Sequence, residues 1–157
     1  MNLSKRCEYA LRALIDLGIA REAGRERVSS AELAAHERIP VRFLEQILLQ
    51  LRRGGFVSSR RGKEGGYAVA RRPASIVVGD VVRMIEGPIG PIACAGEYAS
   101  ATCSCPDRKH CGLRLLMTDV RNAIVSALDR CTLAQVVAVT VRKLRRDREP
   151  IPFRVTA

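Results

Sequence analysis

Four cysteines lie close together in the second half of the chain. Cys94, Cys103, Cys105 and Cys111 fall within eighteen residues of a loop-forming segment. Thiolates are ligands for soft and redox-active metal sites, including iron–sulfur clusters, which accept irregular spacings. Structural zinc favours two close pairs in C-x2-4-C units, and these four cysteines do not form such pairs. The spacing therefore predicts a redox-active metal centre of the iron–sulfur type.

The two remaining cysteines, Cys7 and Cys131, fall on the apolar stripes of predicted helices, so we interpret both as structural. Six cysteines in all would also allow a disulfide framework. However, the first residues enter a charged amphipathic pattern instead of a signal sequence, and no apolar run approaches the roughly 20 residues that span a bilayer. We expect a cytoplasmic protein, no membrane partner and reduced cysteines.

The positive charge is concentrated at the two ends of the chain. Residues 1–73 hold 15 Lys and Arg against 8 Asp and Glu, and residues 142–157 hold 6 against 2, whereas residues 74–141 balance at six and six. A basic block followed by a neutral one fits a nucleic-acid-binding part joined to a sensing or assembly part. A merely solvated basic surface is the alternative.

Three helices are predicted in the basic N-terminal block. Apolar residues at helical spacing indicate a helix over about residues 4–23. Ser29 and Glu32 have the spacing of a capping box and predict the start of a short helix. Pro40 then opens a third helix whose apolar face continues to Gly54. The second and third helices, joined by a tight turn, predict a helix-turn-helix.

A β-hairpin is predicted directly after these helices. Residues 56–59 and 67–70 are short strand patterns that flank the basic, glycine-rich residues 60–66. Glycines allow positive φ and a close approach of the backbone to a phosphate or a minor groove. The hairpin resembles the wing of a winged helix, with an ordinary exposed turn as the alternative.

A long helix follows the cysteine loop. Its apolar stripe runs over roughly five turns and comprises Leu113, Leu116, Met117, Val120, Ile124, Ala127, Leu128 and Cys131. An apolar stripe of that length needs a partner. Thr132 and Gln135 predict the capped start of a final helix.

The expected fold class is mainly α with a small β-hairpin wing, a winged helix-turn-helix plus a long dimerisation helix. We divide the chain into a DNA-binding domain (1–73), a cysteine-loop sensor and dimerisation region (74–141) and a basic, flexible tail (142–157).

Several motifs together resemble the Rrf-type winged-helix regulators of bacteria, the family of IscR, NsrR and RirA, over about residues 1–140. The motifs are Tyr9-Ala10-Leu11-Arg12-Ala13-Leu14, Phe43-Leu44-Glu45-Gln46-Ile47-Leu48, Arg61-Gly62-Lys63-Glu64-Gly65-Gly66-Tyr67, Cys105-Pro106 and Cys111-Gly112-Leu113. The resemblance implies a homodimer that binds a pseudo-palindromic operator in double-stranded DNA. It also implies that the long helix crosses to the partner subunit.

The resemblance also implies a ligand set. Cys105 before Pro106 and Cys111 before Gly112 match two ligands, and Cys94 matches the third. Cys103 departs from the usual three cysteines. It could replace Cys105, serve as a fourth ligand or act as a redox thiol beside the cluster.

The fourth ligand is the weakest match. Some relatives are expected to use a His three residues after the last cysteine, where this chain has Arg114. Other relatives use an acidic residue from the first helix of the opposite subunit, and Glu8 occupies the matching place; a solvated carboxylate is the alternative. His110 ranks low because adjacent residues rarely both reach one metal. Three cysteines with a carboxylate favour a 4Fe-4S over a 2Fe-2S cluster.

Residues near the start of the third helix are the candidates for base reading, because such helices present these side chains to the major groove. We choose Arg42, Glu45 and Gln46, with solvated helix residues as the alternative. Arg61 matches the family position that enters the minor groove. The residues expected to contact phosphates are Lys5, Arg60 and Lys63.

The sequence thus predicts a DNA-binding transcriptional regulator, a repressor, that senses iron, redox state or nitric oxide through an iron–sulfur cluster. A cluster-free repressor, in which Cys103 and a neighbouring cysteine form a disulfide, is the alternative. An iron–sulfur electron carrier is less favoured because it needs no basic winged helix. The chain shows no Ser/His/Asp arrangement, paired-carboxylate loop or phosphate-binding glycine motif, so we do not expect an enzyme.

Overall fold

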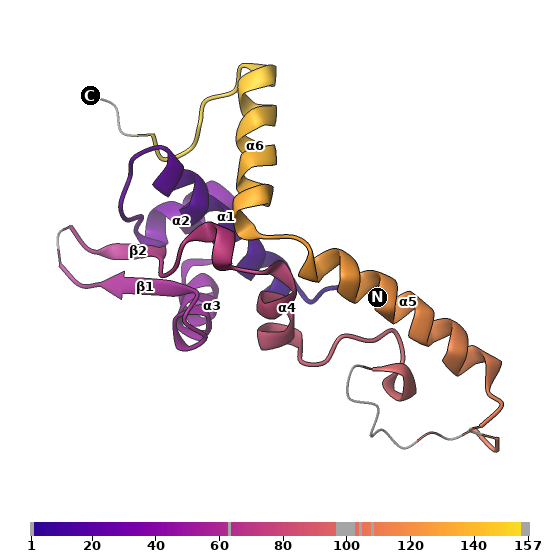
Figure 1. Cartoon of the computed structure of the whole chain (residues 1–157). Coiled ribbons are helices and arrows are strands. Elements are labelled where there is room, and N and C mark those ends of the chain that lie inside the picture. Colours follow the sequence, from indigo (N-terminus) through magenta and orange to yellow (C-terminus); the bar gives the residue numbers. More distant parts are fainter. Residues whose placement is uncertain (1, 63, 97–102, 104, 108, 155–157) are drawn as a thin grey trace.

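A computed structural model of the chain describes residues 2–62, 64–96, 103, 105–107 and 109–154. The elements follow in the order α1 (Lys5–Glu22), α2 (Ser30–Glu37), α3 (Val41–Arg53), β1 (Val57–Arg60), β2 (Gly66–Val69), η1 (Pro73–Ser75), α4 (Val78–Glu86), η2 (Ala93–Ala95), α5 (Gly112–Asp129) and α6 (Leu133–Asp147). Helices α1 to α4 and the hairpin form one body, from which α5 projects (Figure 1). The predicted mainly helical winged fold is confirmed.

The N-terminal helices begin where their capping residues predict. The Ser29 hydroxyl accepts from the Glu32 backbone N–H, and the Glu32 carboxylate accepts from the Ser29 backbone N–H, which completes the predicted capping box. Helix α3 follows Pro40 and buries one apolar face. The fully buried side chains of that face are Leu44, Ile47, Leu48 and Leu51.

Helix α1 is the central element of the core. It packs against α2, α3, α4, α6 and β2. Its buried side is made mostly of small and branched apolar residues, namely Cys7, Ala10, Ala13, Leu14, Leu17, Ile19 and Ala20. Because α1 contacts all of these elements, it fixes the positions of the helix-turn-helix, the wing, α4 and α6 relative to one another.

The wing is a two-stranded antiparallel sheet in which Val57 pairs with Val69 and Arg60 with Gly66. Both strands begin within one residue of their predicted starts, which lies within the usual uncertainty of strand boundaries. Tyr67 also exchanges two backbone hydrogen bonds with Val28 (2.8 and 3.0 Å). This bridge ties the wing to the turn that precedes α2.

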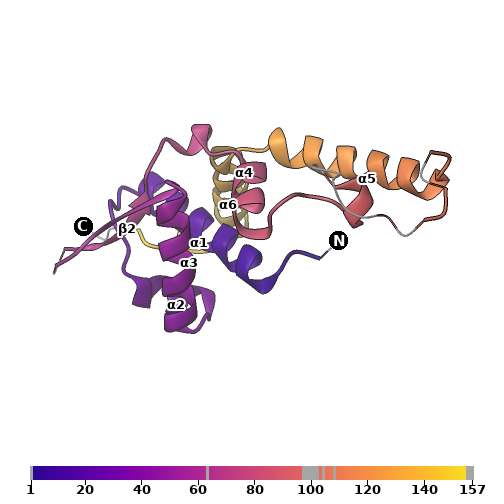
Figure 2. The same ribbon diagram turned by 90° about the horizontal axis from the view of Figure 1, so that it is seen from below.

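Helix α4 was not predicted, and it joins the winged helix to α5. Arg83 of α4 binds the Asp129 carboxylate of α5 through two nitrogens, each 2.8 Å from an oxygen. The apolar C-terminal half of α5 packs nearby through Ile124 and Leu128. Seen from below, the rest of α5 extends away from the body (Figure 2).

The N-terminal half of α5 exposes apolar side chains. None of the eighteen residues of the whole helix α5, all of which the structure describes, is buried. The large exposed side chains are Leu113, Leu115, Leu116 and Val120. A contiguous exposed apolar surface of this kind indicates a protein–protein interface.

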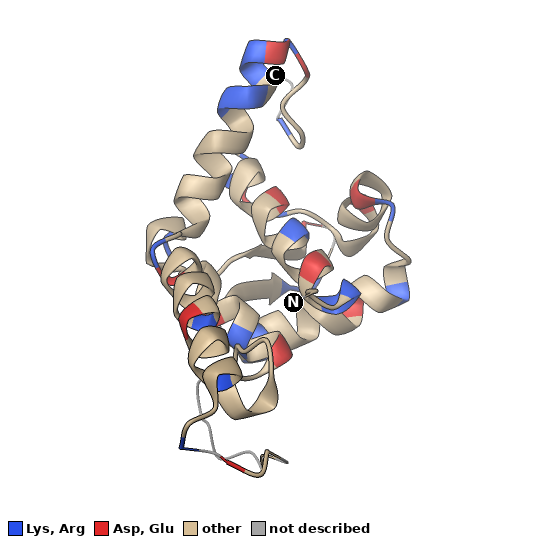
Figure 3. Cartoon of the chain, turned by 90° about the vertical axis from the view of Figure 1, so that its right-hand side faces the viewer, with Lys and Arg blue, Asp and Glu red and all other residues tan. Residues whose placement is uncertain are grey.

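The C-terminal region comprises the end of α6 and a short segment after it. Helix α6 continues to Asp147 and so includes the basic residues 142–146. Ile151 and Phe153 then pack against the core. The last turns of α6 carry mostly Lys and Arg (Figure 3). Among the described residues, no helix is long and apolar enough to cross a membrane.

The contact between α1 and α6 depends on Gly18, because a Cβ there would lie 2.6 Å from Val137 Cγ2. We expect Gly18→Ala to destabilise the fold, since overpacking costs about 1–3 kcal/mol and exceeds the roughly 0.5–1 kcal/mol gained by removing a helical glycine. Denaturant unfolding of Gly18→Ala, Val137→Ala and the double variant measures this. The double variant should lose less stability than the sum of the single changes, and additive losses would contradict the packing described.

Candidate metal centre and nucleic-acid interface

Three of the four loop cysteines gather at the start of α5. The Sγ atoms of Cys105 and Cys111 lie 4.0 Å apart, and the Cys105 backbone N–H donates to Cys103 Sγ (3.4 Å). Hydrogen bonding with the thiols of Cys103 and then Cys111 raises the pKa of Cys105 to about 11. The Cys105 thiol therefore resists ionisation unless a cation compensates its charge, which is the condition that a metal meets.

A turn around Asp107 shapes the chain between Cys105 and Cys111. Asp107 Oδ1 accepts from the backbone N–H groups of Lys109 (2.9 Å) and His110 (3.2 Å), and Oδ2 lies 2.8 Å from His110 Nδ1. The hydrogen bond from the His110 ring is the largest cause of the lowered pKa of Asp107. These contacts use only Nδ1 of the His110 ring and fix its orientation beside Cys111.

Cys94 lies on a different element, η2, which packs against α5. In the part of the chain that the structure describes, no three cysteine Sγ atoms lie within 4.8 Å of one another. The structure thus places Cys105 in contact with both Cys103 and Cys111, does not gather three sulfurs into one ligand group, and leaves Cys94 on η2. Both cysteine-bearing segments adjoin α5: Cys111 is its N-cap residue, and η2 packs against it.

The other two cysteines differ from the loop cysteines in their surroundings. Cys7 is fully buried beside Val82 and Ile89, and burial, followed by the nearby Glu86 charge, raises the pKa of its thiol to about 12. A protonated, enclosed thiol packs as a small apolar group. Cys131, half-buried at the end of α5, donates weakly to the Thr132 carbonyl (3.9 Å).

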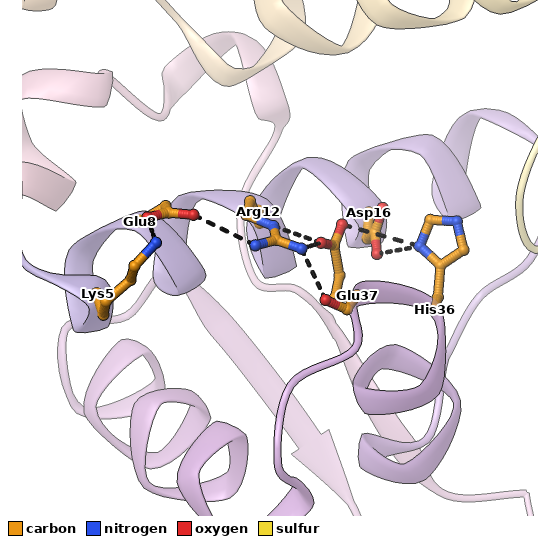
Figure 4. Close-up of polar contacts among 6 residues, drawn as sticks. All are labelled: Lys5, Glu8, Arg12, Asp16, His36 and Glu37. Atoms are coloured by element: carbon orange, nitrogen blue, oxygen red, sulfur yellow. Dashed lines mark hydrogen bonds and ion pairs between the residues drawn. The ribbon is translucent and has the colours of Figure 1, made fainter.

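Glu8, the candidate ligand on α1, is held by cations of its own helix. Its carboxylate oxygens lie 2.7 Å from Lys5 Nζ and 3.3 Å from Arg12 Nη1, and the Lys5 hydrogen bond is the largest cause of the lowered pKa of Glu8. Arg12 also donates to the Glu37 carboxylate and to the Glu37 backbone carbonyl (2.7 Å). Figure 4 shows this series of contacts crossing from α1 to α2. Glu8 is thereby connected to the first helix of the helix-turn-helix.

The same network contains a buried carboxylate that sequence reasoning missed. Asp16 is 3% exposed, and its Oδ2 lies 2.8 Å from His36 Nδ1 of α2 (Figure 4). The His36 side chain is 41% exposed, and its ring lies 5.0 Å from that of Phe153. The spacing of Glu8, Arg12 and Asp16 at four-residue intervals on a mostly apolar helix was the available signal.

Burial raises the pKa of Asp16 to about 7, against the opposing hydrogen bond from His36. The donor atoms of Asp16, His36 and Glu37 lie within 4.8 Å of one another, which is close enough to share a metal ion. His36 already partners Asp16, and Arg12 already partners Glu37. The cluster therefore serves as a polar clamp between α1 and α2.

The candidate DNA-contacting residues lie on α3 and the wing. Arg42, Glu45 and Gln46 are exposed on the first turns of α3, and Glu45 accepts from Ser30 Oγ of α2 (3.1 Å). Helix α3 and β1 are in contact, with Arg52 Nη1 donating to Ser59 Oγ (3.0 Å). The exposed basic candidates outside α3 are Lys5, Arg60 and Arg61. Lys63 lies outside the described residues.

Comparison with known proteins identifies the family to which the chain belongs. Residues 3–139 match the family model of Rrf2, described as an iron-dependent transcriptional regulator. The chain belongs to the Rrf2 family of transcriptional regulators. It is 33% identical to the HTH-type transcriptional regulator NsrR of Geobacillus kaustophilus over 150 residues, which cover 94% of this chain and 99% of that protein.

Two solved structures share the Rrf2 fold. IscR of T. potens has a TM-score of 0.69 and 29% identity, covering 89% of this chain and 88% of that one. CymR, the global cysteine regulator of B. subtilis, has a TM-score of 0.70 and 28% identity, covering 88% and 98%. The resemblance to this family is confirmed, and the chain is a regulator and not an enzyme. The family model is described as iron-dependent, whereas CymR is a cysteine regulator. The comparisons are therefore compatible with cluster sensing and with thiol sensing.

Asp16 gives this Rrf2 protein a defined pH dependence. Because the pKa rises from 3.8 to about 7 on folding, the native state holds a proton that the unfolded chain releases between these values. The free energy of unfolding should therefore fall as pH rises from about 4 to 7, and this fall should shrink in Asp16→Asn. Urea unfolding across this window measures it, with exposed Asp119→Asn as the matched control. Equal pH slopes in Asp16→Asn and the wild type would sink the assignment.

Proposed function

We propose that this Rrf2-family regulator is a homodimeric repressor that binds a double-stranded DNA operator and senses iron, redox state or nitric oxide through an iron–sulfur cluster. The observation that carries the proposal is the contact of Cys105 with both Cys103 and Cys111 at the start of α5. A winged helix on the same chain supplies the output.

The donor set fits a cluster. Thiolates hold iron–sulfur clusters, and binding requires that the thiols lose their protons, which a nearby cation makes favourable. Cys94, Cys105 and Cys111 are the proposed cysteine ligands, and Glu8 of the partner subunit is the proposed fourth. We favour a 4Fe-4S over a 2Fe-2S cluster on this set. When bound, the cluster would supply the chemistry that responds to iron, oxygen or nitric oxide.

Cys103 extends the usual ligand set. Its Sγ accepts from the Cys105 backbone N–H, so it lies beside a proposed ligand. It stands as an alternative to Cys105, as a fourth ligand in place of Glu8, or as a redox thiol next to the cluster. The three roles predict different results for Cys103→Ala. The variant should lose most of the cluster if Cys103 replaces Cys105, part of it if Cys103 is the fourth ligand, and none if Cys103 is a redox thiol.

The exposed face of α5 supports a homodimer. Leu113, Leu115 and Leu116 are each more than half exposed, which is costly for a solitary helix in water. A second copy of α5 would cover them. This pairing would also bring the first helix of one subunit to the cysteine loop of the other, as the Glu8 ligand requires.

A route from the proposed cluster to DNA runs through Arg12. Drawing Glu8 away as a ligand would remove one of the two carboxylates that hold Arg12, leaving Glu37 on α2. Since α2 packs on the reading helix α3, its position affects the helix that contacts bases. A coupling of about 1–3 kcal/mol would give a switch of about 5- to 150-fold in DNA affinity.

A cluster-free thiol switch is the second candidate. Besides the expected pairing of Cys103 with a neighbouring cysteine, one distance supports a pairing of Cys105 with Cys111. Cys105 and Cys111 sulfurs lie 4.0 Å apart, within reach of a small closing movement. Two thiols would give up two protons and two electrons to an oxidant such as a peroxide, forming one disulfide. The resemblance of the fold to the cysteine regulator CymR is compatible with this reading.

The cluster is tested on protein purified without oxygen. We expect a broad visible absorption band with stoichiometric iron and sulfide, and loss of both in Cys94→Ala, Cys105→Ala and Cys111→Ala, because each removes a thiolate ligand. Cys131→Ala is the matched control and should keep the band. A colourless protein with zinc or no metal after reconstitution would reject the cluster and leave the thiol switch.

Base reading by α3 is tested on an operator selected from random duplexes. We expect Arg42→Ala and Gln46→Ala to cost about 1–3 kcal/mol of binding and to relax specificity at one position each. Arg60→Ala should instead weaken all sequences alike and reduce the salt dependence by about one ion, as a phosphate contact does.

The control for these variants is Arg142→Ala, which removes the same charge from α6, and gel-shift titrations at two salt concentrations separate the effects. Unchanged specificity in both α3 variants would show that bases are read elsewhere.

A further inference from the structure

Cys94 lies in a turn that folds tightly on itself. A Cβ on Gly90 would lie 2.7 Å from the Gly96 Cα, so the chain before and after η2 approaches too closely for a larger residue at position 90. Ala95, next to Cys94, is 1% exposed. The backbone N–H of Ala95 donates to the Ile92 carbonyl (3.1 Å) and closes the turn.

One side chain of α5 holds this turn from outside. Arg121 Nη1 donates to the Gly96 carbonyl (2.9 Å) and to the Ala95 carbonyl (3.4 Å). Its Nε and Nη2 donate to Asn122 Oδ1 at 3.1 and 2.7 Å. Both edges of the guanidinium are therefore used: one is anchored on α5, and the other grips the two carbonyls that follow Cys94. Hydrogen bonds from a charged donor are the stronger kind.

We propose that Arg121 is a positioning residue for Cys94 in the metal centre. Cys111 is the N-cap residue of α5, and Arg121 belongs to the same helix. The hydrogen bonds of Arg121, which we call the clamp, therefore attach the turn with Cys94 to the helix that begins at Cys111. A ligand set assembled from a loop gains affinity when its members are held near their bound positions beforehand. This inference rests on the proposed cluster function.

The hydrogen bonds of the clamp require an arginine, because they use both ends of the guanidinium group. Lysine offers a single compact charge, which reaches one carbonyl but cannot also keep the second edge on Asn122. We therefore expect Arg121→Gln to release the turn and Arg121→Lys to hold it in part. Arg130→Gln is the matched control, because Arg130 Nε donates to Ser126 of its own helix (3.1 Å).

Two measurements test the proposal. In the metal-free, reduced protein, alkylation of each cysteine by iodoacetamide is followed by mass spectrometry. Cys94 should react about tenfold faster in Arg121→Gln, with the rate at Cys111 unchanged, since losing a charge-assisted hydrogen bond shifts a local opening by about that factor. In the reconstituted protein, chelator-driven loss of the visible band should be faster in Arg121→Gln, intermediate in Arg121→Lys and unchanged in Arg130→Gln.

The outcomes are separable. A wild type that holds no cluster refutes the proposed function, while the alkylation rates still decide whether Arg121 fixes Cys94. Equal Cys94 rates in Arg121→Gln and the wild type overturn the clamp. A faster Cys94 rate with unchanged cluster loss overturns its role in the metal centre. Should Arg121→Gln fail to fold by circular dichroism, Arg121→Lys carries the same two comparisons.

Discussion

The docking of α1 onto its neighbours is the constraint on which the rest of the structure depends. Five other elements pack against this helix, and its polar side chains Glu8, Arg12 and Asp16 follow one another at four-residue intervals toward α2. Asp16 is nearly enclosed, and a buried carboxylate is tolerated only with partners, which His36 provides. The helix thus uses apolar faces to form the core and one polar stripe to fix the position of the helix-turn-helix.

Helix α5 plays the corresponding part for the cysteines. The loop that carries them has little core of its own, so its order must come from contacts with a regular element. Cys111 occupies the N-cap position of α5, Arg121 holds the turn with Cys94, and the Arg83–Asp129 pair joins the other end of α5 to α4. Under the proposed function, a change at the loop would therefore reach the winged helix through α5.

Local signals predicted most of the fold. Capping pairs such as Ser29 with Glu32 and Thr132 with Gln135 mark helix starts because their hydrogen bonds are made within four residues. Helix α4 was missed because its pattern is short, and its strongest contact, Arg83 with Asp129, joins residues 46 positions apart. The packing of Phe153 on His36 likewise depends on the return of the chain after α6. The cysteines were found from spacing, and the four-residue spacing on α1 was a signal for Asp16, whereas the role of Arg121 becomes visible only when distant segments meet.

In the proposed mechanism Glu8 connects these two systems, and the strengths of its contacts suit that role. Lys5 is 72% exposed and Arg12 is 36% exposed, and ion pairs that water can reach contribute little to stability because water screens them. Arg12 is held more firmly on its other side, where Glu37 is 13% exposed and offers both its carboxylate and its backbone carbonyl. Removing Glu8 from Arg12 therefore disturbs the weaker contact and leaves the stronger one on α2. In the proposed mechanism, ligation by Glu8 would therefore have a small intrinsic cost, and its effect would be directed to the helix that packs on α3.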